Sequence, residues 1–388
     1  MIYGDDGIDS QASVRRTNVR RALQLVFRNS GIETRAGIAR ATGLTAATAS
    51  SLVAELIERR LVVEGGQAAS TGGKRATTLS IDARHHLVLA LIIRPKDALA
   101  ALVSLDGVTV YEERVTYSND EHQRVVAIML NRIAERFGAR MLVASVQLMG
   151  ATDGRTVLES VQLNLRDEPL AEKFERTLGV PVHLVNDVDA EAIAEGITSH
   201  EASGHRLFIH IGTGVGASVT LDGEVAPGPS TRGGEIGHVQ VVFGEEARLC
   251  RCGLRGCVES AFSMTAMLGE SFEEGMSDED IAHLLATADP AHLAIGAVAL
   301  ARTIKLLSAM IDPEEVIIGG FANVLGDDFL DAVRHGLAYE ARGTVQVPVR
   351  YANEEIPVFA GAAQFGLLAA LGVRWTPEQL MVQPRLAS

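Results

Sequence analysis

Three cysteines and one histidine lie close enough along the chain to form a metal site. The three cysteines of the 388-residue chain, Cys250, Cys252 and Cys257, fall within eight positions, and His238 stands twelve residues upstream. Three thiolates and one imidazole make a complete tetrahedral ligand set for zinc, and the interleaved glycines permit the sharp turn that would bring the sulfurs together. We therefore predict a structural zinc site. Three unrelated buried thiols are the alternative, and the odd count argues against disulfides.

Carboxylates near this segment and elsewhere could bind the hydroxyl groups of a sugar. Glu235 precedes His238 by three residues, and Glu259 follows the last cysteine by two. Asn186-Asp187 stands where an expected strand meets an expected helix, a common position for ligand-contacting groups in α/β folds. A carboxylate there could accept a hydrogen bond from a sugar hydroxyl or act as a general base. An Asn-Asp pair could also be only a helix cap.

Two glycine-rich turns each allow two interpretations. Gly212-Thr-Gly-Val-Gly216 could approach a phosphate with its backbone N–H groups, or it could be a tight hairpin between two strands. Ile317-Ile-Gly-Gly320 could bend beside a nucleotide, or it could be only a tight turn.

Positive charge is concentrated in the N-terminal part of an acidic chain. Residues 13–80 contain eleven basic and four acidic residues, a net charge of +7, which leaves −21 for the remainder of a chain whose net charge is −14. Such asymmetry is typical of a basic nucleic-acid-binding domain on an acidic body.

The basic segment has the pattern of a winged helix-turn-helix domain, which we place at residues 1–82. Thr34 and Thr45 are expected N-caps, and Gly43 is expected to end the helix between them. The predicted helices are 14–29, 35–42 and 45–60, and the predicted strands are 61–64 and 76–81. The start of the third helix, rich in small and hydroxyl-bearing residues, could enter a DNA major groove. The residues expected to contact DNA are Arg35, Thr45, Ala46, Thr48, Ser50, Ser51 and, in a wing between the strands, Lys74 and Arg75. A three-helix oligomerisation module is the alternative.

From Leu87 onward strands and helices alternate, which predicts an α/β body of two lobes with a cleft between them. The predicted strands are 87–93, 99–105, 108–115, 141–148, 180–185, 206–211, 216–221, 316–320 and 357–360, and the predicted helices are 120–137, 188–195 and 293–311. We find no apolar run long enough to span a bilayer and no signal peptide, so we expect a cytoplasmic protein without a membrane partner.

These motifs resemble those of the ROK family of bacterial repressors and sugar kinases. The matching segments are Glu235-Ile-Gly-His238, Cys250-x-Cys252-Gly-x-x-Gly-Cys257-x-Glu259, and Asn186-Asp187 with Ala190 and Glu195 downstream. The resemblance implies an actin/hexokinase-like (ribonuclease H-like) body at residues 83–388. Its two lobes would divide near residues 185–195, and a C-terminal helix would return to the first lobe.

The same resemblance implies which residues bind ligands. Zinc would be bound by His238, Cys250, Cys252 and Cys257. The sugar contacts would be Asn164, Asn186, Asp187, Glu235, His238 and Glu259. Asp187 matches the general base of the family's kinases.

The chain departs from the family pattern at three places, and the first of them favours a protein without kinase activity. Where the kinases begin the body with Asp-x-Gly-Gly-Thr-Lys, this chain has Ile92-Ile-Arg-Pro-Lys-Asp97. This segment lacks the paired glycines that let a backbone approach ATP phosphates. Asp189 stands where the family usually has Asn, and Leu148-Met-Gly150 replaces a segment that usually contains Pro-Gly. Because the glycines are missing, we expect that the protein does not bind ATP. We expect the zinc to be structural.

The sequence predicts a sugar-responsive transcriptional regulator, most simply a repressor of carbohydrate genes. A dimer or tetramer would bind a palindromic or inverted-repeat operator, and sugar binding would change the DNA affinity. The alternatives are an ATP-dependent sugar kinase with an N-terminal regulatory extension and a regulator controlled by a phosphotransferase protein.

Overall fold

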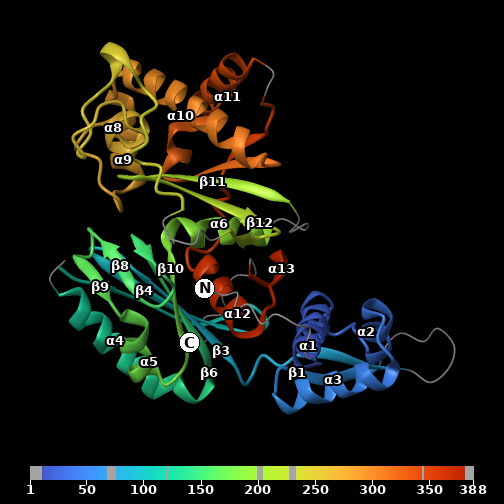
Figure 1. Ribbon diagram of the computed structural model, residues 1–388. Coiled ribbons are helices and arrows are strands. Elements are labelled where there is room, and N and C mark those ends of the chain that lie inside the picture. The colour runs from blue at the N-terminus through green and yellow to red at the C-terminus, as the bar shows by residue number, and fades with distance from the viewer. Residues whose placement is uncertain are drawn as a thin grey trace. The chain divides into compact units, whose positions relative to one another are not determined.

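The computed structural model describes residues 11–67, 76–118, 121–198, 204–226, 233–342 and 345–380, and the chain divides into two compact units (Figure 1). The first unit contains Met1–Ala190, Ile197–His200 and Glu355–Ser388, and the second contains Glu191–Gly196 and Glu201–Glu354. The C-terminal segment therefore belongs to the same unit as the N-terminal half of the chain.

The first unit begins with three helices and a pair of strands, in the predicted order. These elements, which we call the head, are α1 (Gln11–Arg28), α2 (Arg35–Thr42), α3 (Ala46–Glu58), β1 (Val62–Gln67) and β2 (Thr77–Ile81), drawn in blue in Figure 1. The two strands pair antiparallel. On α1 the apolar residues at helical spacing, Val19, Leu23, Val26 and Phe27, are buried as predicted.

Side-chain caps set the ends of the second and third helices, as the sequence predicted. The Thr34 hydroxyl accepts a hydrogen bond from the Gly37 N–H at 3.0 Å, and the Thr45 hydroxyl accepts one from the Thr48 N–H at 3.2 Å. Gly43 ends α2 with φ of 70°, a left-handed conformation that costs glycine little.

A five-stranded sheet in the order β10-β6-β3-β4-β5 forms the centre of the first unit. Its strands are β3 (Leu87–Ile93), β4 (Asp97–Ser104), β5 (Thr109–Thr116), β6 (Met141–Leu148) and β10 (Val182–Asn186). The β3, β4 and β5 strands form an antiparallel meander, while β6 runs parallel to β3 and β10 runs parallel to β6.

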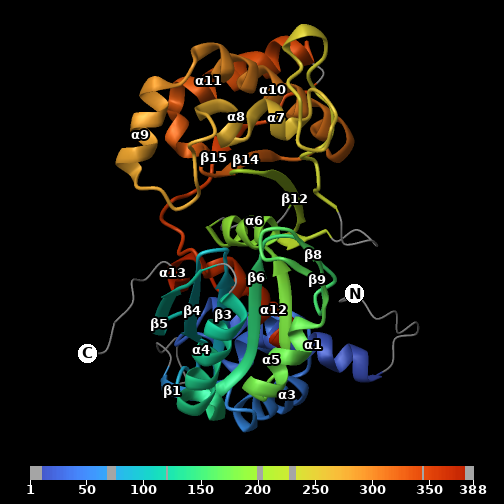
Figure 2. The ribbon, with the colours of Figure 1, turned by 90° about the vertical axis from the view of Figure 1, so that its left-hand side faces the viewer.

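Helices cover both faces of this sheet, which explains why β3 is buried along its whole length. One face packs against α4 (His122–Phe137) and α5 (Leu170–Leu178), which Figure 2 shows in front of the strands. The other face packs against α12 (Ala360–Leu371), where a Cβ atom on Gly366 would lie 3.1 Å from the Ser145 Cβ and 3.2 Å from a Val88 methyl.

Smaller elements complete the first unit. A short helical turn, η1 (Gly138–Arg140), precedes β6, and a three-stranded sheet of β7 (Ala151–Thr152), β8 (Val157–Ser160) and β9 (Leu165–Glu168) follows it. The sequence did not predict this small sheet, because its strands are too short to show an alternating pattern.

A C-terminal strap, residues 372–380, follows α12, includes α13 (Pro377–Leu380) and joins the sheet to the head. The Arg374 N–H donates to Gln24 Oε1 on α1 at 2.7 Å, and Gln24 Nε2 donates to the Arg374 carbonyl at 3.0 Å. On α12 the buried Gln364 accepts from the Trp375 N–H at 3.0 Å and donates to the Val373 carbonyl at 3.2 Å. The strap is therefore bonded at once to a helix of the head and to a helix on the sheet.

The second unit contains its own five-stranded sheet, in the order β13-β12-β11-β14-β15. The strands are β11 (His205–Ile211), β12 (Val215–Leu221), β13 (Glu224–Val225), β14 (Glu315–Gly320) and β15 (Val349–Tyr351). The helices between β10 and α12 in the chain are α6 (Asp187–Thr198), α7 (Val258–Phe262), α8 (Met264–Leu268), α9 (Asp278–Thr287), α10 (Pro290–Ile311) and α11 (Gly326–Ala341), with short turns η2 (Gly244–Glu246) and η3 (Ala322–Leu325).

Two sequence expectations are wrong. The strand expected at 357–360 does not form, since this segment leads directly into α12, and the late strand is instead β15. One helix, α10, is long and apolar enough to cross a bilayer, contrary to the expectation for the whole chain. Within the second unit, however, Leu300 and Ile304 on α10 are fully buried, and Arg302 Nε donates to Glu340 Oε1 at 3.0 Å. These contacts are those of a core helix.

Candidate functional site

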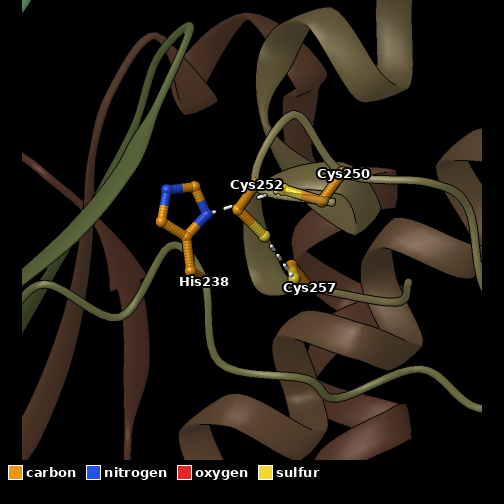
Figure 3. A group of neighbouring side chains, drawn as sticks. All are labelled: His238, Cys250, Cys252 and Cys257. Atoms are coloured by element: carbon orange, nitrogen blue, oxygen red, sulfur yellow. Dashed lines mark hydrogen bonds between the residues drawn. The ribbon is translucent and has the colours of Figure 1, made fainter. Parts of the chain in front are cut away.

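The predicted zinc ligands come together in one cluster of the second unit (Figure 3). The ligand atoms of His238, Cys250, Cys252 and Cys257 all lie within 4.8 Å of one another. The Cys252 and Cys257 sulfurs are 3.7 Å apart, and the Cys250 sulfur is 3.5 Å from His238 Nδ1. Zinc–sulfur bonds of about 2.3 Å in a tetrahedron place two sulfurs about 3.8 Å apart. The donor set and its spacing therefore fit a tetrahedral zinc ion.

Glycines shape the loop that carries the three sulfurs, as the sequence predicted. Gly253 and Gly256 have φ of 88° and 74°, which favour glycine. A Cβ on Gly256 would also overlap the Val242 carbonyl oxygen. The loop closes where the Cys250 N–H donates to the Leu254 carbonyl at 2.7 Å.

Burial makes one of the thiols a weak acid in the absence of a cation. Burial and the neighbouring sulfurs raise the pKa of the Cys257 thiol to about 12. Zinc binds the thiolate, so metal binding at this position must release the proton.

The loop between the cysteines also holds the predicted sugar contact Glu259. Arg251 Nε and Nη2 donate to the two carboxylate oxygens of Glu259 at 2.8 and 2.9 Å, a bidentate ion pair. The Glu259 N–H donates to the Gly237 carbonyl at 2.8 Å. Only 9% of Glu259 is exposed. The cysteine loop and the Glu235–His238 segment thus fix this carboxylate from two sides.

The other two predicted sugar contacts of the second unit are exposed. Glu235 and His238 both lie at the surface of the unit. The Nδ1 atom of His238 faces the Cys250 sulfur, and Nε2 points away from the cluster (Figure 3). An imidazole in this orientation can bind a metal with one nitrogen and a second ligand with the other.

The remaining predicted sugar contacts lie in the first unit. Asn186 Oδ1 accepts from the Val188 and Asp189 N–H groups at 2.9 and 3.2 Å, so Asn186 caps α6, the alternative that the sequence left open. Asn186 Nδ2 donates to the Gly150 carbonyl at 3.0 Å, which ties the end of β6 to this helix start. Asp187 is half-buried in the first turn of α6.

Asn164 stands apart from this helix start in the chain. It lies in the turn between β8 and β9, where it is exposed and has φ of 51°. The structure thus places three predicted sugar contacts in each unit.

The predicted DNA contacts of the third helix are accessible. Thr45, Ala46, Ser50 and Ser51 are exposed on the first two turns of α3, while Thr48 is half-buried and its hydroxyl lies 2.9 Å from that of Thr45. Two other expectations have different outcomes. Arg35 forms an ion pair with Glu64, and Lys74 and Arg75 lie outside the described residues.

The segment Ile92–Asp97, in which the sequence lacks the expected phosphate-loop glycines, contains the closed hairpin turn between β3 and β4. The Arg94 N–H donates to the Asp97 carbonyl at 2.9 Å, and the Tyr117 hydroxyl is 2.8 and 2.7 Å from the Arg94 and Asp97 carbonyls. The Arg94 and Arg114 guanidinium groups approach the Asp97 carboxylate at 3.5 and 3.2 Å. The Arg94 N–H and the Arg94 and Asp97 carbonyls are therefore hydrogen-bonded within the protein, and the Asp97 carboxylate is ion-paired.

The two glycine motifs of the second unit differ in what surrounds them. A Cβ on Gly319 would overlap the Phe208 ring, and one on Gly320 would lie 2.5 Å from the Ile211 carbonyl oxygen, so packing within the unit requires both glycines. The turn at Gly212 bonds instead to Glu274, 61 residues downstream of Thr213. Sequence reasoning missed Glu274 and Arg251, because neither belongs to a recognisable spacing pattern.

The model of the ROK family matches residues 95–362, more than half of the chain. The chain belongs to the ROK family. Its similarity to solved ROK structures extends to the fold: the ROK transcriptional regulator described as a homologue of Escherichia coli MLC superposes with a TM-score of 0.73 at 22% identity, over 95% of this chain and 98% of that one.

ROK proteins of two kinds are similar to this chain. The xylose repressor of Bacillus subtilis (strain 168) is 27% identical over 289 residues, which are 71% of this chain and 74% of the repressor. An N-acetylmannosamine kinase of Vibrio cholerae is 34% identical over 191 residues, which are 48% of this chain and 65% of the kinase. The similarity to the repressor therefore covers more of the chain.

Proposed function

We propose that this ROK protein is a sugar-responsive transcriptional regulator that represses carbohydrate genes. The observation that carries the proposal is the head, a basic segment whose third helix begins with exposed small and hydroxyl-bearing residues. Such a helix start fits the major groove of DNA, and β1 and β2 would carry the wing of a winged helix-turn-helix. Similarity to a xylose repressor over most of the chain supports this function.

The effector in this proposal is a sugar, bound through the predicted contact residues. Asp187 and Asn186 would contribute from the start of α6, and Asn164 from the turn between β8 and β9. Glu235, His238 and Glu259 would contribute from the second unit. Carboxylates and amides accept and donate the paired hydrogen bonds that sugar hydroxyls require.

Zinc has a structural role in this proposal. Four protein ligands leave no open coordination position for catalysis. The metal would hold the cysteine loop, and through Arg251 that loop would hold Glu259 in place for the sugar.

We infer that the protein does not use ATP. Phosphoryl transfer depends on close backbone contacts to the phosphates, and in the turn between β3 and β4 both Arg94 backbone groups are already hydrogen-bonded. The similarity to N-acetylmannosamine kinase keeps a kinase as the second candidate. ATP turnover on hexoses and N-acetylhexosamines decides between them: a rate above about one per second would contradict the regulator without kinase activity.

Contacts inside the first unit offer a route from the sugar to the head. The α6 helix begins at Asp187, and a Cβ on Gly361 of α12 would overlap the Ala190 carbonyl oxygen of α6. Through Gln364, α12 bonds to the C-terminal strap, which bonds to Gln24 on α1. A shift of α6 on sugar binding would therefore reach α1 through elements that are packed or hydrogen-bonded to one another.

The regulator would act as a cytoplasmic dimer or tetramer on a palindromic or inverted-repeat operator. Two-fold assemblies place two recognition helices on two half-sites. The salt dependence of DNA binding would report the phosphate contacts of the head.

One experiment tests the function directly. DNA sites selected from a random library with the full-length protein serve as probes, and a thermal-shift screen of neutral sugars identifies the effector. Asp187→Ala is expected to bind DNA as the wild type does and to lose the sugar response. Asp328→Ala, which removes an exposed carboxylate on α11, is the matched control. Release of DNA by sugar at the wild-type concentration in Asp187→Ala would contradict the proposed site.

A further inference from the structure

The turn between β11 and β12 bonds to a carboxylate of the protein itself. The Thr213 N–H donates to Glu274 Oε1 at 3.0 Å, and the Thr213 hydroxyl donates to the same oxygen at 2.8 Å. These are the groups that a glycine-rich turn would otherwise present to a phosphate oxygen. The sequence alone left open whether this turn approaches a phosphate.

The space beside the turn is also filled. A Cβ on Gly212 would lie 2.8 Å from Glu274 Oε1 and 2.8 Å from His210 Nε2, so both side chains lie close against the turn. On the next residue but one, a Cβ on Gly214 would lie 3.4 Å from Glu259 Oε2. Two carboxylates therefore approach the same turn.

Glu274 is held in place by the segment that carries it. Phe272, two residues before Glu274, is 3% exposed, and its ring meets the Phe321 ring edge to face, with centroids 5.5 Å apart. The Phe321 N–H donates to the Ile211 carbonyl at 2.8 Å, at the end of β11. The carboxylate and the turn that it binds are thus both anchored where β11 and β14 end.

We infer that Glu274 determines ligand specificity in the second unit by occupying the phosphate position of the Gly212–Val215 turn. A polyphosphate would have to displace a hydrogen-bonded carboxylate and would be repelled by it and by Glu259. The turn therefore excludes nucleotides and phosphorylated ligands, and the second unit binds uncharged ligands. This inference goes beyond the proposed regulator function, and its test uses neither DNA nor sugar.

Calorimetry with inorganic tripolyphosphate and with ATP tests the inference on the full-length protein. Wild type is expected to show no measurable binding of either anion, and Glu274→Ala is expected to bind tripolyphosphate at least about tenfold more tightly than the weakest affinity that the calorimeter detects. Glu274→Gln, which keeps an acceptor oxygen but removes the charge, should fall between them. Glu270→Ala, which removes an exposed carboxylate a few residues away, should behave as wild type.

A second substitution locates the bound anion. Adding Thr213→Val to Glu274→Ala removes the hydroxyl donor and should reverse most of the gain in affinity. A gain that survives Thr213→Val would place the anion elsewhere and overturn the inference. So would unchanged affinity in both Glu274→Ala and Glu274→Gln. If Glu274→Ala does not fold, Glu274→Gln decides alone, because it retains the contact to the turn. If the wild type showed no sugar response, that would contradict the proposed function. The calorimetry result on tripolyphosphate binding would not be affected.

Discussion

The cysteine loop and the Gly212–Val215 turn are both glycine-containing segments of the second unit, yet they have opposite relations to ligands. In the cysteine loop, three sulfurs and one imidazole nitrogen converge within 4.8 Å of one another. In the glycine turn, the donor groups of Thr213 are already bonded to Glu274. One segment is organised to receive a ligand from outside the chain, and the other has its partner within the chain.

The difference shows that glycines indicate where the backbone can approach another group closely. They do not indicate whether that group is a ligand or a side chain of the protein. Converging thiolates repel one another and are stabilised only by a metal ion. Backbone N–H and hydroxyl donors are satisfied by any oxygen, whether of a phosphate or of a side chain. The identity of the ligand atoms is therefore a stronger guide to function than the glycines between them.

The largest effect is expected from removing the metal. Cys252 is exposed, so Cys252→Ser changes little packing and isolates metal loss. We expect loss of bound zinc, measured by metal analysis, and a fall in the free energy of unfolding of roughly 3 kcal/mol or more. Chelator treatment of the wild type should lower the melting temperature equally, and Ser271→Ala, at an exposed position outside the cluster, is the control. One zinc per chain in Cys252→Ser would show that the cluster is not the metal site.

A carboxylate bound by the protein's own donors should contribute to stability, and Asp82 at the end of the head allows this to be measured. The Arg84 side chain, aided by the Arg84 N–H, lowers the pKa of Asp82 to about 2. A lowered pKa gives stability that is complete above the unfolded-state pKa near 4 and is lost as pH falls toward 2. The wild type should exceed Asp82→Asn by about 2 kcal/mol at pH 7, and the difference should shrink by pH 3 in urea unfolding. A constant difference would contradict this role.

Glu274 should show the same kind of contribution in the glycine turn. Glu274→Ala leaves the Thr213 N–H without its acceptor, and we expect the free energy of unfolding to fall by about 1–2 kcal/mol. Glu274→Gln should lose less, because the amide oxygen still accepts. Equal stability of Glu274→Ala and wild type in urea unfolding would mean that the hydrogen bonds between Glu274 and the turn do not contribute to the free energy of unfolding.

The smallest effect is expected where the cysteine loop reaches Glu259. Arg251 is 63% exposed, so Arg251→Ala should lower the free energy of unfolding by no more than about 1 kcal/mol. Zinc content should be unchanged, while the effector sugar should bind more weakly in calorimetry because Glu259 is no longer oriented. Arg251→Lys, which keeps the charge but loses the bidentate contact, should lie between the two. Loss of zinc in Arg251→Ala would mean that the loop depends on this ion pair.

The sequence by itself determined the elements and the site whose parts are near one another along the chain. Apolar spacing and capping residues predicted α2 and β3 to the residue, because periodicity and caps are local properties of the backbone. The ligand cluster was predictable for the same reason, since its members span twenty positions and their chemistry has few uses.

Only the tertiary structure decided which distant groups meet. Glu274 lies 61 residues from the turn that it occupies, and Gln24 lies 350 residues from Arg374. No local pattern encodes such pairs, because they depend on how strands order into sheets and where the chain re-enters the first unit. The four residues of the candidate zinc site could be predicted from the sequence because local spacing brings them together. The partner of the glycine turn could not be predicted, because only the folded sheet brings Glu274 to that turn.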